Sequence, residues 1–178
     1  MHRLFVALRP PPALRAACLT AMEDGPPGWA WQDEDQLHLT LRYIGEVDRP
    51  LAEDVASALG GVRAPTIDLA LDGVGWFDQG RSGTLFARCG PAEPLAALHK
   101  KIDRALVRAG LKPERRAFLP HITLARRRSG AVDPAGWAER RAGLASDIVT
   151  VTSLLLYESH LSRHGSSYEA IETYPLTG

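Results

Sequence analysis

The sequence predicts an α+β fold in one domain of two similar lobes, and three observations support this fold class. The chain has 178 residues, of which 45% are hydrophobic and 24% are charged, as is typical of one globular domain. The order strand, helix, strand, helix, strand can be traced twice along it. The middle strand of each repeat carries a histidine followed two positions later by a threonine. We therefore expect a duplicated domain that spans residues 1–178.

Periodic apolar residues locate the elements of the first repeat. Alternation indicates half-buried strands over residues 3–9, 37–45 and 66–74. The proline run after the first strand opens a helix whose apolar positions are Leu14, Ala17, Cys18 and Ala21. A second helix is expected to begin after Asp48 as its N-cap and to end at Gly60.

The second repeat shows the same order of elements. Pro120 lacks a backbone N–H, so it is expected at the start or edge of its strand. The pattern predicts strands at 83–90, 117–126, 147–157 and 167–174, and helices at 94–110 and 134–141.

Charge and cysteine content exclude several function classes. Lys+Arg and Asp+Glu both number 21, so the chain lacks the basic field of a protein that coats nucleic acid. Cys18 and Cys89 are the two cysteines, and without a C-x-x-C spacing they indicate neither a disulfide framework nor a thiolate metal site. No apolar run is long enough for a signal peptide or a membrane span. We expect a cytoplasmic protein that does not bind membranes.

The repeated motif occurs in "LHLTLRYIG", residues 37–45, and in "LPHITLARR", residues 119–127. Side chains two apart in a strand point to the same face. His38 and Thr40 therefore share one face, while the flanking leucines share the other, and the second motif repeats this arrangement. If the lobes are related by pseudo-symmetry, both polar faces meet in one cleft.

Two imidazoles and two hydroxyls in one cleft favour acid–base chemistry on a phosphodiester. Histidine titrates near neutrality, so one ring can take a proton from water while the other gives one to a leaving oxygen. Threonine hydroxyls can donate to phosphate oxygens that gain charge in the transition state. The motif spacing does not assign the two roles. The predicted catalytic residues are His38, Thr40, His121 and Thr123.

Other site types find less support. One His-x-Thr alone is more often an ordinary strand segment, but two copies in equivalent places favour function. Two histidines without a carboxylate or a third histidine make a poor metal site, so none is expected. No G-x-S-x-G elbow and no phosphate-binding glycine loop occur, so neither a serine nucleophile nor ATP use is expected. We expect no cofactor.

At these residues the chain resembles the 2H phosphoesterase superfamily, and within it the LigT/ThpR-like RNA 2′,3′-cyclic phosphodiesterases, also called 2′-5′ RNA ligases. The likeness extends from "RLFVAL" through both motifs to "LLLYESHLSRHGSSYEAIETYPL". The resemblance implies a bilobal fold in which two antiparallel sheets line a central cleft and helices lie outside. It also implies hydrolysis of a terminal 2′,3′-cyclic phosphate to a 2′-phosphate, and ligation in reverse. By position, His38 would be the proton donor and His121 the proton acceptor.

The resemblance adds candidate substrate contacts. Arg126 lies where the family has a phosphate-binding arginine, although strict alternation would place it opposite His121 unless the strand bends. Phe5 could stack on a base or pack in a second core. Arg42 shares the face of His38 and could attract phosphate. Tyr43 is a further candidate for contact with a nucleobase.

Three functions remain open from sequence. The leading hypothesis is an enzyme that acts on RNA with a 2′,3′-cyclic phosphate terminus. Another is a 2H esterase for a small cyclic nucleotide or an ADP-ribose cyclic phosphate. The third is a non-catalytic module that binds RNA ends, although binding alone would not need two titratable groups. We expect the protein to be a monomer.

Overall fold

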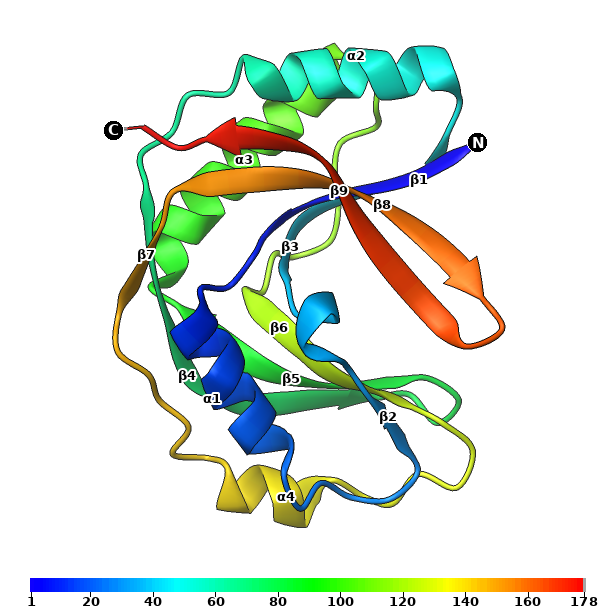
Figure 1. Cartoon of the computed structure of the whole chain (residues 1–178), viewed down its shortest axis with the longest axis vertical. Coiled ribbons are helices and arrows are strands. Elements are labelled where there is room, and N and C mark those ends of the chain that lie inside the picture. The colour runs from blue at the N-terminus through cyan, green and yellow to red at the C-terminus, as the bar shows by residue number, and fades with distance from the viewer. Residues whose placement is uncertain (178) are drawn as a thin grey trace.

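Nine strands form a strongly curled sheet system in the computed structural model, which describes residues 1–177 (Figure 1). All the strand pairs are antiparallel. The strands are β1 (His2–Leu8), β2 (Trp29–Trp31), β3 (Leu39–Val47), β4 (Ile67–Asp78), β5 (Gly83–Gly90), β6 (His121–Arg127), β7 (Val149–Val151), β8 (Ser153–Ser162) and β9 (Gly165–Pro175). The helices are α1 (Pro12–Met22), α2 (Arg49–Gly60), α3 (Ala92–Arg108) and α4 (Ala135–Arg140), with a 3₁₀ turn η1 (Glu34–Gln36).

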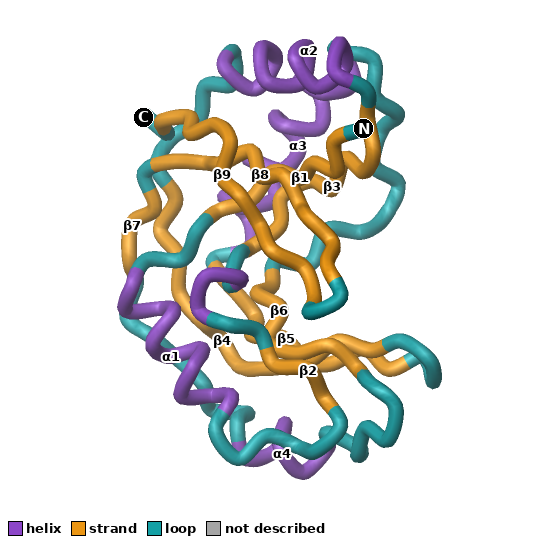
Figure 2. Tube along the Cα trace, turned by 45° about the vertical axis from the view of Figure 1, so that its right-hand side comes forward, coloured by secondary structure: helices purple, strands orange, loops and turns teal. Residues whose placement is uncertain are grey.

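The strand order divides the molecule into two lobes. The first lobe contains β3, β1, β8 and β9, and the second contains β7, β4, β5 and β6, with β2 on β6. Helices α2 and α3 contact each other beside the first lobe, whereas α1 and α4 lie with the second (Figures 1 and 2). The α+β fold with two antiparallel sheets and outer helices is therefore confirmed.

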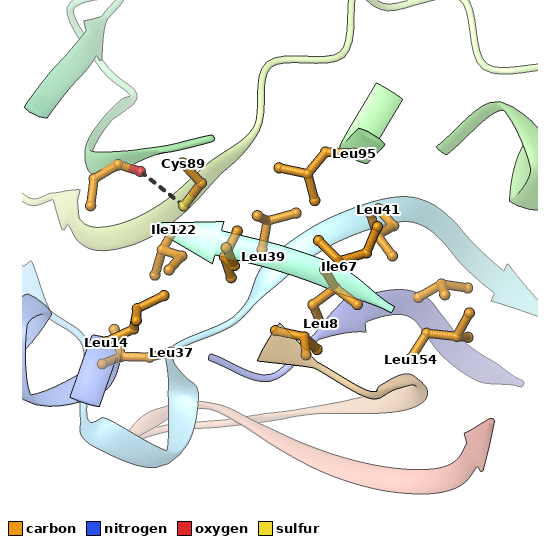
Figure 3. Packing of buried hydrophobic residues seen from close by; sticks show 14 of the residues in the cluster. Leu8, Leu14, Leu37, Leu39, Leu41, Ile67, Cys89, Leu95, Ile122 and Leu154 are labelled. Atoms are coloured by element: carbon orange, nitrogen blue, oxygen red, sulfur yellow. Dashed lines mark hydrogen bonds between the residues drawn. The ribbon is translucent and has the colours of Figure 1, made fainter. Parts of the chain in front are cut away.

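One short contact joins the two sheets. Leu39 of β3 and Ile122 of β6 are the paired residues between them. Both side chains are fully buried, and they lie next to each other in the core (Figure 3). The same core cluster includes Leu8, Leu14, Leu41, Leu95 and Leu154, so it runs beneath both lobes. The lobes thus share one core.

The two repeats exchange strands, which the sequence pattern did not predict. Strand β4 belongs to the first repeat but pairs with β5 and β7 in the second lobe. Strand β8 belongs to the second repeat but pairs with β1 in the first lobe. The prediction of one continuous strand at 147–157 is therefore wrong. It is interrupted at Thr152, where the chain leaves one sheet and enters the other.

Local signals were otherwise good guides to the elements. Asp48 caps α2, since its carboxylate accepts the backbone N–H of Leu51 at 3.0 Å. Pro120 immediately precedes β6, as expected for a residue without a donor. Strand β2 and turn η1 were missed because three residues are too few to show a period. Cys18 and Cys89 are buried, so they contribute to packing.

Within residues 1–177, no helix combines the length and apolar character that crossing a membrane requires.

Candidate active site

The contact between β3 and β6 brings the two motifs together. His38 immediately precedes Leu39, and His121 immediately precedes its partner Ile122. Because the strands are antiparallel, extending this register places His38 toward Thr123 and Thr40 toward His121. In regular pairing the diagonal between the two histidines would span roughly 7–8 Å between Cα atoms. Thr40 and His121 border the same hollow, and the charge of His121 acts on His38, so the two motifs lie close together between the lobes.

Each imidazole is oriented by a hydrogen bond of the same kind, from Nδ1 to a backbone carbonyl oxygen. Nδ1 of His38 lies 2.7 Å from the carbonyl oxygen of Gln36, and Nδ1 of His121 lies 2.7 Å from that of Leu119. A carbonyl can only accept, so Nδ1–H is the donor in each pair. The proton-exchanging atom of each neutral ring is then Nε2. In both motifs the residue two positions before the histidine thus fixes the tautomer.

Aromatic rings pack against each histidine. The His38 ring lies 4.8 Å from that of Phe5 and 5.1 Å from that of Tyr168, measured between centroids. The His121 ring lies 5.1 Å from that of Phe86. Phe5 is only 4% exposed and stacks on Tyr157 at 5.1 Å. Its role in the structure is therefore to support His38 in a second small core rather than to offer a face to a base.

The pKa of each histidine is lowered. The pKa of His38 is lowered from 6.5 to about 4, and burial is the largest cause. The hydrogen bond to the Gln36 carbonyl raises this pKa, whereas the charges of Arg126 and His121 lower it further. Burial also lowers the pKa of His121, with a further contribution from Arg126. Both rings are therefore neutral at pH 7 in the free protein. A bound anion would oppose these effects.

A β-bulge turns Arg126 toward the histidines. Phe86 pairs with Thr123 and Leu85 pairs with Ala125, so Leu124 has no partner across from it. One extra residue reverses the alternation, and Arg126 then shares the face of Thr123. Arg126 is exposed, while Leu124 and Ala125 are buried. The bend that the sequence analysis required is thus present.

The first motif contains a matching bulge. Ala7 pairs with Thr40 and Val6 with Arg42, which leaves Leu41 without a partner. Tyr43 consequently reaches the exposed face, where it occupies the position that Arg126 has in the second motif. The side chain of Tyr43 is 48% exposed.

Arg42 does not face the phosphate position, contrary to the sequence expectation. The bulge turns it inward, where it is 8% exposed. Its guanidinium donates from Nε to Asp103 at 2.8 Å and also bonds the carbonyls of Tyr43 and Lys112. These partners occupy the donors that a phosphate would need. Arg42 is therefore part of the protein framework.

Two hollows lie beside the motifs. One of about 310 Å³ is bordered by Thr40, Tyr43, Phe77, His99, Arg116, Phe118, Leu119 and His121, among others. The other, of about 410 Å³, lies under the β4–β5 hairpin and is bordered by Phe77, Arg81, Thr84, Arg126 and Arg127, among others. Phe77 stands between them and is 48% exposed. The site is therefore continuous with one aromatic and one basic surface.

Sequence reasoning missed Phe86 and Phe77. The ring of Phe86 is buried and lies directly over Gly75, where a Cβ would come within 2.6 Å of it. Two glycines, at 73 and 75, inside an otherwise regular strand were the signal that a neighbouring side chain approaches the backbone.

Nowhere in residues 1–177 do three His, Cys, Asp or Glu side chains gather as a metal-binding group. The two histidines of the motifs lie with threonines and aromatic rings instead.

Comparison with known proteins identifies related chains. The RNA 2′,3′-cyclic phosphodiesterase of Escherichia coli (strain K12) is 31% identical over 180 residues, which cover 99% of this chain and 97% of that one. The protein of the same name from Aeropyrum pernix is 30% identical over 143 residues, or 78% and 81% of the two chains. The crystal structure of E. coli LigT complexed with 3′-AMP has a TM-score of 0.80 at 26% identity and covers 99% of both chains.

A family model described as the 2′-5′ RNA ligase superfamily matches residues 10–163, which include both motifs and Arg126. Given that match and the full-length similarity to the E. coli protein, the chain belongs to the 2′-5′ RNA ligase superfamily.

Proposed function

We propose that this protein hydrolyses 2′,3′-cyclic phosphate ends of RNA to 2′-phosphate ends, using two histidines as acid and base. The observation that carries the proposal is the meeting of both His-x-Thr motifs at the Leu39–Ile122 contact. Nδ1 of each ring is engaged by a backbone carbonyl, which leaves both Nε2 atoms for proton transfer. The relatives named RNA 2′,3′-cyclic phosphodiesterase support the choice of substrate.

The reaction balances with these groups alone. Nε2 of His121 takes a proton from water as the water oxygen bonds to phosphorus. The bond from phosphorus to the 3′ oxygen breaks, and protonated His38 gives that oxygen a proton. Thr40 and Thr123 donate to the non-bridging oxygens, and Arg126 balances their charge. The family resemblance assigns the two roles, since the bonds to the two rings are alike.

Substrate binding would prepare His38 for its role. The ring is neutral at pH 7 in the free protein, because its pKa is about 4. A phosphate between the two rings opposes the positive charge of Arg126 and stabilises an imidazolium, which raises this pKa. With a 5′-hydroxyl in place of water, the same steps form a bond from its oxygen to phosphorus and break the bond to the 3′ oxygen, so the product is a 2′-5′ linkage. One chain supplies every group named, so a monomer suffices.

The test uses an oligonucleotide with a 2′,3′-cyclic phosphate end and an excess of chelator. We expect the wild type to form the 2′-phosphate, and His38→Ala and His121→Ala each to lower kcat by about 10²–10⁴-fold. His160→Ala is the matched control, because His160 lies at the exposed end of β8 beside Glu169. An inactive wild type, or full activity in both variants, would contradict the proposal. Binding without turnover would instead favour an RNA-end binding module.

A further inference from the structure

Arg42 ties a loop to the strand that carries the first motif. Besides Asp103, its guanidinium faces Glu114 at 3.7 Å and bonds the carbonyl oxygen of Lys112. Asp103 lies on α3, while Lys112 and Glu114 lie in the loop between α3 and β6. One buried side chain of β3 thus holds a helix and a loop together.

The two carboxylates extend this network into the loop backbone. Asp103 accepts the N–H of Glu114 at 3.1 Å. Glu114 in turn accepts the N–H groups of Arg115 and Arg116 at 2.9 and 3.0 Å. Its bond from the Arg116 N–H is the largest cause of its lowered pKa, so the carboxylate stays ionised at neutral pH. The conformation of residues 114–116 therefore depends on Arg42.

This loop forms the outer wall of the 310 Å³ hollow beside Thr40 and His121. Arg116 borders the hollow, is exposed and makes no salt bridge with any residue in the described part of the chain. Phe118 borders it as well and is stacked on His99, with ring centroids 4.4 Å apart and planes at 2°. The wall therefore offers one guanidinium beside a fixed aromatic surface.

We propose that this hollow binds the nucleotide unit next to the reacting phosphate, that Arg116 contacts its phosphodiester, and that Arg42 is a positioning residue for this contact. The proposal rests on the proposed function. Exposed aromatic faces accept nucleobases without sequence preference, and a guanidinium suits the paired oxygens of a phosphodiester. A terminal nucleotide alone has no second phosphate for Arg116. This wall therefore affects the affinity for substrates longer than one nucleotide and leaves the rate of the chemical step unchanged.

The first experiment compares a nucleoside 2′,3′-cyclic monophosphate with a dinucleotide that ends in the same group. Arg116→Ala is expected to raise KM for the dinucleotide roughly 3- to 10-fold. The effect is this small because Arg116 is exposed and solvent screens its charge. The kcat of this variant, and KM for the mononucleotide, should stay within about two-fold. Arg115→Ala removes the same charge from the neighbouring position and should leave KM for both substrates unchanged. Equal effects on both substrates, or none, would overturn the subsite.

The second experiment tests the positioning role by hydrogen exchange, which needs no activity. Arg42→Met combined with Asp103→Leu avoids leaving one buried charge alone. We expect amide exchange in residues 114–116 to accelerate at least about ten-fold, with β6 and β1 unchanged, and KM to rise for the dinucleotide only. Unchanged exchange in the loop would overturn the role of Arg42. Wild-type inactivity on both substrates would instead refute the proposed function and leave the exchange result standing.

Discussion

Burial keeps the imidazoles of His38 and His121 neutral in the free protein at pH 7. Each ring is half-buried among aromatic residues and bonded through Nδ1, and neither has a carboxylate partner among the hydrogen bonds of residues 1–177. Desolvation then favours the neutral form, as does the nearby positive charge of Arg126. In the proposed mechanism, the phosphate of the substrate supplies the negative charge that stabilises the imidazolium of His38.

This electrostatic balance predicts the pH dependence of catalysis. The profile of kcat/KM reports groups in the free enzyme, whose His38 has a pKa of about 4 and whose His121 has a pKa below 6.5. We expect a bell with its acidic limb near pH 4, a maximum below pH 6.5 and a decline above it. The profile of kcat should lie at higher pH, because bound phosphate raises the pKa values. A kcat/KM that stays constant between roughly pH 6.5 and 9 would contradict the paired mechanism, because the fraction of protonated His38 falls over this range.

Arg126 gives a second prediction at the level of single residues. Its charge lowers the pKa of both histidines, so Arg126→Met should raise both values in an NMR titration of the imidazole protons. The same variant should lose activity, because the charge also stabilises the phosphate oxygens. Arg128→Met removes an exposed charge two residues further along and should leave both titrations unchanged. Unshifted titrations in Arg126→Met would place its charge too far away to act.

In each motif strand, the bulge directly after the threonine does more to arrange the site than strand periodicity does. Each omits one leucine from the pairing and thereby turns the fifth residue after its histidine into the cleft. Tyr43 and Arg126 are exposed for this reason, and Arg42 is buried for the same reason. The rigid frame of the site therefore includes irregular backbone.

The bulges also mark where prediction from sequence ends. The spacing of His38 and Thr40, and of His121 and Thr123, sufficed to place each pair on one face, because two residues of regular strand are enough. The faces of Arg42 and Arg126 could not be predicted, since a bulge is stabilised by pairing with another strand. The division of residues 147–157 between two sheets was hidden for the same reason. Local periodicity carries no information about the partner strand.

Gly75 allows a prediction at the level of the β4–β5 pair. A Cβ there would lie 2.6 Å from the ring of Phe86, which is 3% exposed and supports His121. Gly75→Ala should therefore lower the free energy of unfolding by about 1–3 kcal/mol, as overpacking does. Urea unfolding measures this. Gly60→Ala is the control, since its Cβ would meet only ordinary contact at 3.9 Å, and it should change stability by less than about 1 kcal/mol.

At the scale of the whole molecule, the two lobes share one core and exchange strands, which predicts a single unfolding transition. The chain carries its own probes for this test. Its tryptophans, at positions 29, 31, 76 and 137, lie in β2, β4 and α4, while its tyrosines, at 43, 157, 168 and 174, lie in β3, β8 and β9. Tryptophan fluorescence thus reports the second lobe and tyrosine absorbance the first. Their denaturation midpoints should coincide, and separate midpoints would show independent lobes.

The exchange of strands also determines when the protein can fold during synthesis. Strands β8 and β9 follow all the other described strands in the chain, yet they complete the sheet that contains β1. The first lobe consequently stays unfinished until β8 and β9 have left the ribosome, and β1 keeps an open edge until then. A nascent or truncated chain would carry both histidine motifs without Tyr157 and Tyr168 around His38. The ring cluster around His38 is therefore completed only after both motif strands have been made.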